Sequence, residues 1–149
     1  MTRRSYSGGF TIVELLIVIV IIGILAALVI ISYNGIQIRA RDTDRASDIS
    51  TIKKKLEIFY ANNGYYPSAL DMQLSSFRTS QLDLVNDEVT PSGSTSTIAY
   101  CWPGQTTRYC YGGRNADNTD CVTNGLRCPK YWIVYRTEAN PTTNIFYST

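Results

Sequence analysis

The hydrophobic pattern divides the chain into an apolar N-terminal segment and a mixed remainder. From Phe10 to Ile31 only Thr11 and Glu14 have strongly polar side chains. A helix over this stretch would span roughly 33 Å, close to the hydrocarbon thickness of a bilayer. The pattern therefore predicts a membrane-spanning helix over residues 10–31.

A second helical pattern follows, in which apolar residues recur at spacings of three, four and three positions. These residues are Ile49, Ile52, Leu56 and Phe59. Lys53–Lys55 fill much of the opposite face, which we interpret as solvated, with a docking patch for another subunit as the alternative. Asn63-Gly64 followed by Pro67 is typical of a helix end. One helix from Phe10 to Asn63 is therefore predicted, amphipathic over residues 32–63.

The remaining residues favour a sheet. Residues 68–97 are weakly patterned, with a short helix expected near Leu70–Phe77 and a loop at Pro91–Ser94. Four runs rich in Tyr, Ile and Val predict strands, and these are Thr97–Trp102, Arg108–Tyr111, Tyr131–Arg136 and Asn144–Tyr147. Turns are expected at Pro103-Gly104 and Asn140-Pro141. The fold class is thus α+β, with the long helix packed against an antiparallel sheet of about four strands.

Composition narrows the functional classes. The formal net charge is +2, too small to indicate nucleic acid as an obligate partner. The chain contains no histidine, which excludes triads and metal sites that depend on that residue. No nucleophile stands beside a recognisable base. We therefore expect a protein that is not an enzyme and has no obligate cofactor.

The N-terminus fits other export signals poorly. The apolar stretch is too long for a secretory signal peptide, and Leu25-Ala26-Ala27 is a poor cleavage site. Arg3-Arg4 lacks the apolar pair expected after it in a twin-arginine signal. An ordinary single-pass anchor, oriented by these two arginines, accounts for the topology with the head outside the cytoplasm. It does not account for Glu14.

Glu14 is costly in a membrane helix, by about 2.5–3.5 kcal/mol on insertion scales. The cost is understandable if the carboxylate acquires a partner later. Cleavage between Gly9 and Phe10 would release an amine four residues before Glu14. In a staggered stack of helices, the amine of an incoming subunit would meet Glu14 of its neighbour and neutralise it.

The run Gly9-Phe10-Thr11-Ile12-Val13-Glu14 resembles the processing motif of the type IV pilin and type II secretion pseudopilin family. The resemblance covers roughly residues 8–67, and beyond Pro67 it is one of general plan. It implies cleavage after Gly9 by a membrane-embedded prepilin peptidase, N-methylation of Phe10 and an assembly role for Glu14. Ile31 is a departure, because many members have a proline late in the apolar segment.

The resemblance also implies an organisation and a set of partners. Residues 1–9 would be a cleaved leader, residues 10–31 the filament core helix, and residues 64–149 a head with a disulfide region at 101–128. The expected partners are copies of the same chain, the peptidase, a membrane platform with a motor ATPase and, before assembly, the lipid bilayer. The protein would begin in the cytoplasmic membrane and end in an extracellular filament.

The filament's task stays open. A major pilin, a minor pilin and a pseudopilin share these features, and adhesion, twitching motility, DNA uptake and secretion all use them. A membrane-anchored extracellular binding head is the alternative class.

Four cysteines lie close together in the C-terminal half, and an exported compartment favours two disulfides. They are Cys101, Cys110, Cys121 and Cys128. Four cysteines allow three pairings. We favour the sequential one, because Cys101 and Cys110 are equally far from a turn between Gln105 and Thr106 and would face each other in a hairpin. The spacing and the compartment argue against a zinc site.

Two further patterns have less specific interpretations. An oxygen-rich run, 115–120, includes Asp117 and Asp120 and is a weak candidate for calcium, although an ordinary Asn/Asp turn is favoured. The many Tyr and Trp residues suit a sheet packed on a helix. An exposed subset of them is a candidate for stacking on bases or sugars.

Overall fold

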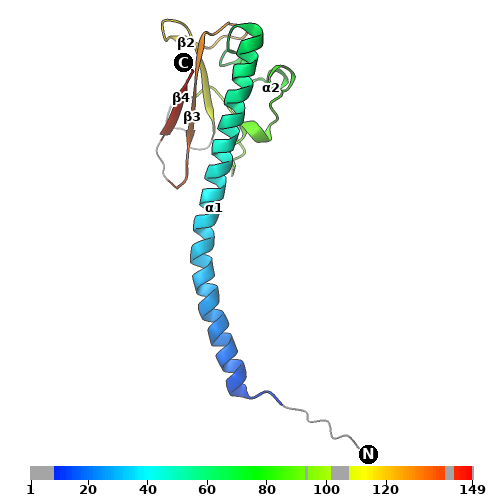
Figure 1. Ribbon diagram of the computed structural model, residues 1–149, viewed down its shortest axis with the longest axis vertical. Coiled ribbons are helices and arrows are strands. Elements are labelled where there is room, and N and C mark those ends of the chain that lie inside the picture. The colour runs from blue at the N-terminus through cyan, green and yellow to red at the C-terminus, as the bar shows by residue number, and fades with distance from the viewer. Residues whose placement is uncertain (1–8, 93, 102–107, 140–142, 149) are drawn as a thin grey trace, which may run out of the picture. The chain divides into compact units, whose positions relative to one another are not determined.

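A computed structural model of the chain describes residues 9–92, 94–101, 108–139 and 143–148 (Figure 1). The chain divides into two compact units, Met1–Gln37 and Ile38–Thr149. The expected turns at Pro103-Gly104 and Asn140-Pro141, most of the proposed leader, and Trp102 lie outside the described residues.

Helix α1 comprises Ile12–Asn63, so the predicted apolar and amphipathic helices are one continuous element. Thr11 precedes it as the N-cap, which is why the helix begins two residues later than expected. At the other end Gly64 adopts a φ of 77° and donates its N–H to the Tyr60 carbonyl at 2.7 Å. This left-handed residue ends the helix where the sequence predicted.

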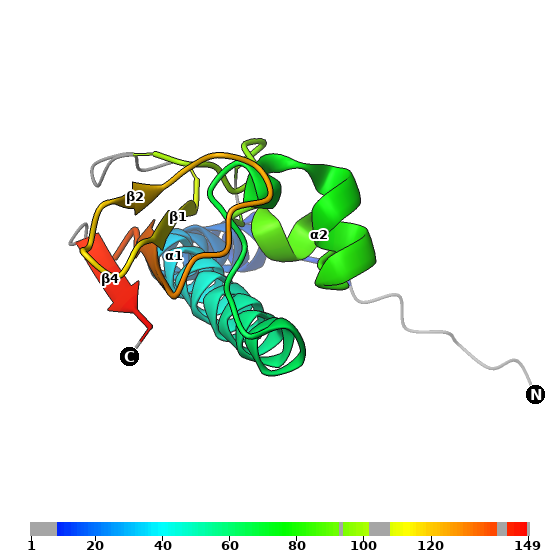
Figure 2. The same cartoon turned by 90° about the horizontal axis from the view of Figure 1, so that it is seen from above.

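The second unit contains the part of α1 beyond Gln37 together with a sheet and short helical segments. In Figures 1 and 2 the sheet lies on one side of this part of the helix, and the short helix α2 (Ser75–Gln81) lies on the other. Two 3₁₀ turns, η1 (Asp71–Gln73) and η2 (Asp87–Val89), flank α2. The short helix expected near Leu70–Phe77 is therefore a 3₁₀ turn followed by an α-helix that continues to Gln81.

The sheet has four antiparallel strands in the order β2-β1-β3-β4. Their bounds are β1 (Cys110–Arg114), β2 (Asp120–Cys121), β3 (Lys130–Arg136) and β4 (Thr143–Tyr147). The α+β class and the strand count are confirmed. The registers place Gly112 opposite Trp132, and Trp132 opposite Tyr147.

One strand expectation is wrong. Within the described part of Thr97–Trp102 only Ala99 pairs, in an isolated parallel bridge with Cys110. The predicted antiparallel hairpin of residues 97–111 is therefore not formed. Strand β2 instead lies beside β1 at that edge of the sheet. The run 108–111 marks the beginning of β1, which continues through Gly112 and Gly113 to Arg114.

The predicted helical stripe forms the centre of the head. Its four residues are at most 5% exposed: Ile49, Ile52, Leu56 and Phe59. They pack in one cluster with inward residues of the sheet, among them Tyr111, Tyr131 and Ile133. Buried tyrosine hydroxyls find acceptors, because an unpaired hydroxyl in a core costs free energy. Tyr111 donates to the Pro67 carbonyl at 2.7 Å, and Tyr131 to Glu57 at 3.1 Å.

Candidate functional site: the processing and assembly segment

The start of α1 is fixed by a reciprocal capping arrangement between Thr11 and Glu14. The Thr11 backbone N–H donates to Glu14 Oε2 at 2.9 Å, and its hydroxyl donates to the same oxygen at 2.7 Å. In return the Glu14 N–H donates to Thr11 Oγ1 at 3.2 Å. This capping box satisfies backbone donors that the first turn of a helix leaves without a partner. Glu14 thus has a local partner before any other chain is present.

The apolar residues that follow Glu14 are exposed within the first unit. The large hydrophobic side chains from Phe10 to Ile30 range from 48% exposed at Val18 to 86% at Ile12. An 18-residue window in α1 has a mean hydropathy of 3.4, and none of it is buried. Apolar surface on this scale requires a lipid or protein environment. By length and composition the segment is able to cross a membrane.

The two residues at the proposed cleavage bond are open to a peptidase. Gly9 and Phe10 lie before the helix, and Phe10 is 83% exposed. A Cβ placed on Gly9 would meet no atom within 4 Å. The chain's own fold therefore does not require glycine at this position, and a requirement for glycine would have to come from another molecule.

Within the second unit, charged residues of α1 hold the segment that follows β3. Glu138 accepts hydrogen bonds from Arg41 and from Arg45, whose side chain is 8% exposed. Asp42 accepts the backbone N–H groups of Glu138 and Ala139 at 2.7 and 2.9 Å. The Arg41 hydrogen bond is the main cause that lowers the pKa of Glu138 below its ordinary value of 4.5.

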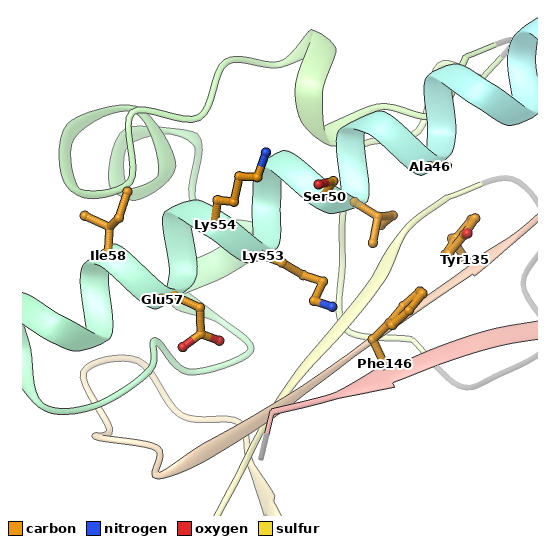
Figure 3. Close-up of a pocket in the computed structure, with 9 residues that line it drawn as sticks. Ala46, Ser50, Lys53, Lys54, Glu57, Ile58, Tyr135 and Phe146 are labelled. Atoms are coloured by element: carbon orange, nitrogen blue, oxygen red, sulfur yellow. The ribbon is translucent and has the colours of Figure 1, made fainter.

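The block Lys53–Lys55, interpreted as a solvated face, has three different environments. Lys54 is exposed, whereas Lys55 forms an ion pair with Glu88 at 3.1 Å and also donates to the Asp83 carbonyl. Lys53 lies over the ring of Phe146, with its Nζ 4.6 Å from the centroid. Figure 3 shows Lys53 reaching toward Phe146 while Lys54 points to the other side of the helix.

A groove of about 700 Å³ lies on this face of the head (Figure 3). Its floor combines apolar side chains of α1 with Tyr135 of β3 and Phe146 of β4, and Lys53 and Glu57 stand at its margin. Glu57 is already engaged, because both of its oxygens accept tyrosine hydroxyls, from Tyr66 at 2.8 Å and Tyr131 at 3.1 Å.

The four cysteines are paired in sequence order, Cys101 with Cys110 and Cys121 with Cys128. The pairing is as predicted, but the predicted reason, an antiparallel hairpin, is wrong. The segment before Cys101 pairs with β1 in a parallel bridge between Ala99 and Cys110. The second disulfide is buried, and the Cys128 backbone also exchanges hydrogen bonds with Tyr66 at 2.7 and 3.1 Å. The disulfides therefore anchor two irregular segments to the sheet.

The oxygen-rich run forms a turn stabilised from within. Asp117 Oδ1 accepts the backbone N–H and the hydroxyl of Thr119, and Asn118 has a φ of 65°. Asp120 Oδ2 accepts the Tyr100 hydroxyl at 2.7 Å. Among the described residues no group of three or more carboxylates or thiols is placed to hold a metal ion. The weak calcium candidate, Asp117 with Asp120, therefore has no third acidic or thiol ligand among the described residues and stays a prediction.

Two features of these sites were missed in the sequence. The Thr11-x-x-Glu14 spacing is itself a signal for a capping box. The prediction for Glu14 rests only on the charge of its carboxylate and does not include this contact. The contacts of Glu138 with Arg41 and Arg45 join residues more than 90 positions apart, and no local pattern indicates them.

Comparison with known proteins identifies the N-terminal segment. The family described as "Prokaryotic N-terminal methylation motif" matches residues 4–30. Type II secretion system core protein G of Escherichia coli (strain K12) is 38% identical over 68 residues, 46% of this chain and 47% of that protein. The protein of the same name from Pseudomonas aeruginosa is 41% identical over 68 residues, again 46% of this chain and 47% of the relative.

The chain thus matches about half the length of these curated relatives. No solved structure gave a significant match. Three observations agree with one another: the long helix whose start is capped by Thr11 and Glu14, the exposed apolar surface, and the family match at residues 4–30. Together they confirm the resemblance to the pilin and pseudopilin family, whose N-terminal methylation motif this chain carries.

Proposed function

We propose that this chain is a structural subunit of a helical filament of the type IV pilus and type II secretion kind. It is inserted in the membrane as a precursor, cut between Gly9 and Phe10, methylated at Phe10 and polymerised through its apolar helix. The observation that carries the proposal is the exposed apolar surface from Phe10 to Ile30, which lies within the matched methylation motif. Burying that surface against other copies supplies the driving force for assembly.

The similarity to type II secretion system core protein G favours a pseudopilus over a surface pilus. The partners in this reading are further copies of the chain, a prepilin peptidase and a membrane platform with its motor ATPase. The bilayer holds the subunit before assembly, with the head outside the cytoplasm. The role is structural and not catalytic.

The geometry of Glu14 allows it to cap its own helix and to bind a neighbour at once. Both side-chain hydrogen bonds to Thr11 use Oε2. Within the described residues Oε1 accepts none, so it is available for the Phe10 amine of an adjacent subunit. Because apolar helices slide past one another without a preferred position, this ion pair would also set the axial stagger. An unpaired charge in the filament core costs several kcal/mol.

The test separates the charge of Glu14 from its capping role. Glu14→Leu removes both, Glu14→Gln keeps a side chain that suits a capping box but removes the charge, and Thr11→Val removes the capping hydroxyl but keeps the charge. We expect the two Glu14 variants to insert in the membrane at least as well as the parent but to form few or disordered filaments. Thr11→Val should lose about 1 kcal/mol of helix stability and still assemble.

Filament number, subunit spacing, membrane level and processing at Phe10 are measured together for each variant. Filaments of Glu14→Gln at parental number and spacing would overturn the assembly role of Glu14. Equal failure of Thr11→Val would assign the defect to helix capping instead of to charge.

A further inference from the structure

A cavity on the outer face of the sheet is not used by the proposed filament function. Side chains of β3 alternate between the two faces: Tyr131, Ile133 and Tyr135 join the main core, whereas Trp132 and Val134 pack in a second cluster with Cys110. The outer-face cavity, of about 370 Å³, lies on the side of Trp132. Its lining includes Tyr100, Arg114, Asn118, Asp120, Trp132 and Tyr147. This volume is within the range of small-molecule sites.

Trp132 forms a fixed aromatic wall of the outer-face cavity. The side chain is 6% exposed, and its ring fills the space above Gly112, where a Cβ would lie 2.4 Å from the indole. Tyr100 adds a second ring, 6.4 Å from Trp132 between centroids, and is tethered by its neighbour Cys101 through the disulfide to Cys110. The Trp132 Nε1–H has no hydrogen-bond acceptor among the described residues. A buried donor of this kind is costly unless a ligand or water accepts from it.

Arg114 supplies a cation that forms no ion pair within the described residues, although Asp120 lies opposite it in the register of β1 and β2. Its guanidinium carbon lies 5.8 Å from the centroid of the Tyr147 ring. Its Nε is buried and makes no hydrogen bond, and no ion pair of this arginine occurs within the described residues. A guanidinium in this position offers a planar pair of donors to a carboxylate. Tyr147 meanwhile remains 59% exposed and presents an aromatic platform.

Polar groups complete the lining with both donors and acceptors. Asp120 and Asn118 contribute oxygens, and Lys130 donates to the Asn118 side chain at 3.4 Å. A neighbouring cavity of about 430 Å³ shares Arg114, Asn118 and Tyr147 with the outer-face cavity and adds Lys130. The nearby charges balance, with two cations, Arg114 and Lys130, against two carboxylates, Asp117 and Asp120.

We propose that the outer-face cavity binds a short saccharide that carries one carboxylate, such as a uronic acid linked to a neutral sugar. The C–H-rich face of a pyranose is attracted to the negative face of an aromatic ring, as cations are. Tyr147 provides that ring, Arg114 binds the carboxylate, and Asp120 with Asn118 accept sugar hydroxyls. Single-stranded nucleic acid fits less well, because it requires a groove with a run of uncompensated cations.

The test uses the full chain in a polyoxyethylene detergent, which has no sugar headgroup. Cellobiouronic acid and cellobiose are a matched pair that differ only in the carboxylate, and both are titrated by calorimetry. We expect cellobiouronic acid to bind about tenfold more tightly, because its carboxylate adds charge-assisted hydrogen bonds to Arg114. Arg114→Gln should remove this difference. Tyr147→Ala should weaken both sugars, and Tyr147→Phe should bind as the parent does.

Arg127→Gln is the matched control, because Arg127 lies 5.2 Å from the ring of Tyr65, outside the outer-face cavity. It should bind both sugars normally. Saturation-transfer NMR on the parent chain provides a measurement that needs no variant, and sugar C–H protons should receive magnetisation from aromatic protons. Absence of binding and transfer at millimolar sugar would overturn the proposal. So would an equal loss in Arg127→Gln, or a thymidine oligonucleotide that binds more tightly and displaces the sugar.

Discussion

Gly9 stands immediately before the proposed cleavage bond, and the chain's own structure leaves space for a side chain there. We therefore expect Gly9→Val to fold and insert normally but to accumulate as full-length precursor, because the peptidase requires an unobstructed backbone. Gel mobility and intact mass of the membrane fraction measure the processed share. Gly8→Val is the control and should be cut. Normal cleavage of Gly9→Val would contradict the assignment of this bond.

Gly112 is required for packing and not for backbone freedom. A methyl group there would lie 2.4 Å from the Trp132 indole, so Gly112→Ala must displace that ring. We expect a loss of about 1–3 kcal/mol in the free energy of unfolding, typical of overpacking. Thermal unfolding monitored by near-ultraviolet circular dichroism measures it. Gly35→Ala, where a Cβ meets no atom within 4 Å, should leave the head transition unchanged. Equal midpoints for both variants would show that Trp132 is not held by Gly112.

Glu14 was identifiable from the sequence because a carboxylate in an apolar run is rare and costly. Its capping contact with Thr11 is local, and the three-residue spacing was sufficient to predict it. The hydrogen-bond partners of Tyr109 and Tyr111 were not predictable, because Asp48 and Pro67 lie 61 and 44 positions away along the chain. Residue patterns thus indicate what a side chain requires, and only the tertiary structure supplies its partner.

The contact between α1 and the segment after β3 should weaken in acid. Since Arg41 holds the pKa of Glu138 below its ordinary value of 4.5, the folded chain binds this proton less tightly than the unfolded chain does. The stabilisation is complete above about pH 4.5 and is lost as pH falls through the lower folded pKa. Because Glu138 is partly exposed, we expect a contribution of only about 1 kcal/mol.

Glu138→Gln tests this linkage. Its unfolding midpoint should lie below that of the parent at pH 7, and the two midpoints should converge as the pH falls below the folded pKa. Thermal unfolding of both proteins from pH 7 to pH 3 gives the comparison. A difference that stays constant over this range would contradict the proposed contribution of the carboxylate.

Elements with strong periodicity were predictable, and the short or glycine-containing ones were not. The stripe Ile49–Phe59 and the branched and aromatic run of β3 were recognised within a residue or two. The predicted strand ends at Tyr111, whereas β1 continues to Arg114, because glycine is unfavourable in strands and the prediction stopped before Gly112. Gly112 and Gly113 are tolerated because Trp132 and Cys128 pack closely against them. Strand β2 has two residues, too few for any pattern.

Both disulfides should be fully formed in all molecules of the protein isolated from the filament. Intact mass without reductant, before and after alkylation, should reveal no free thiol. Replacing Cys121 and Cys128 together by Ala should cost about 3 kcal/mol in the chain-entropy description, while membrane insertion continues. The pair Cys101 and Cys110 closes a loop of similar length and serves as a comparison. Alkylation of the parent protein in the absence of reductant would contradict the pairing.

For the molecule as a whole, the sequence was sufficient to predict a long helix with an antiparallel sheet on it, because a bipartite hydrophobic pattern has few other solutions. It was not sufficient for the outer-face cavity. That cavity depends on the register of Trp132 against Gly112 and Tyr147, which only the completed sheet determines.

The central claim is that the chain is cut and methylated before it assembles. Intact mass and N-terminal fragment analysis of filaments sheared or extracted from the envelope test it most directly. We expect a chain that begins at N-methylated Phe10, with the mass of residues 10–149 plus one CH2 for the methylation, less the four hydrogens lost in two disulfides. Assembled filaments whose subunits retain Met1 or Gly9, begin at another residue, or begin at an unmethylated Phe10 would contradict it.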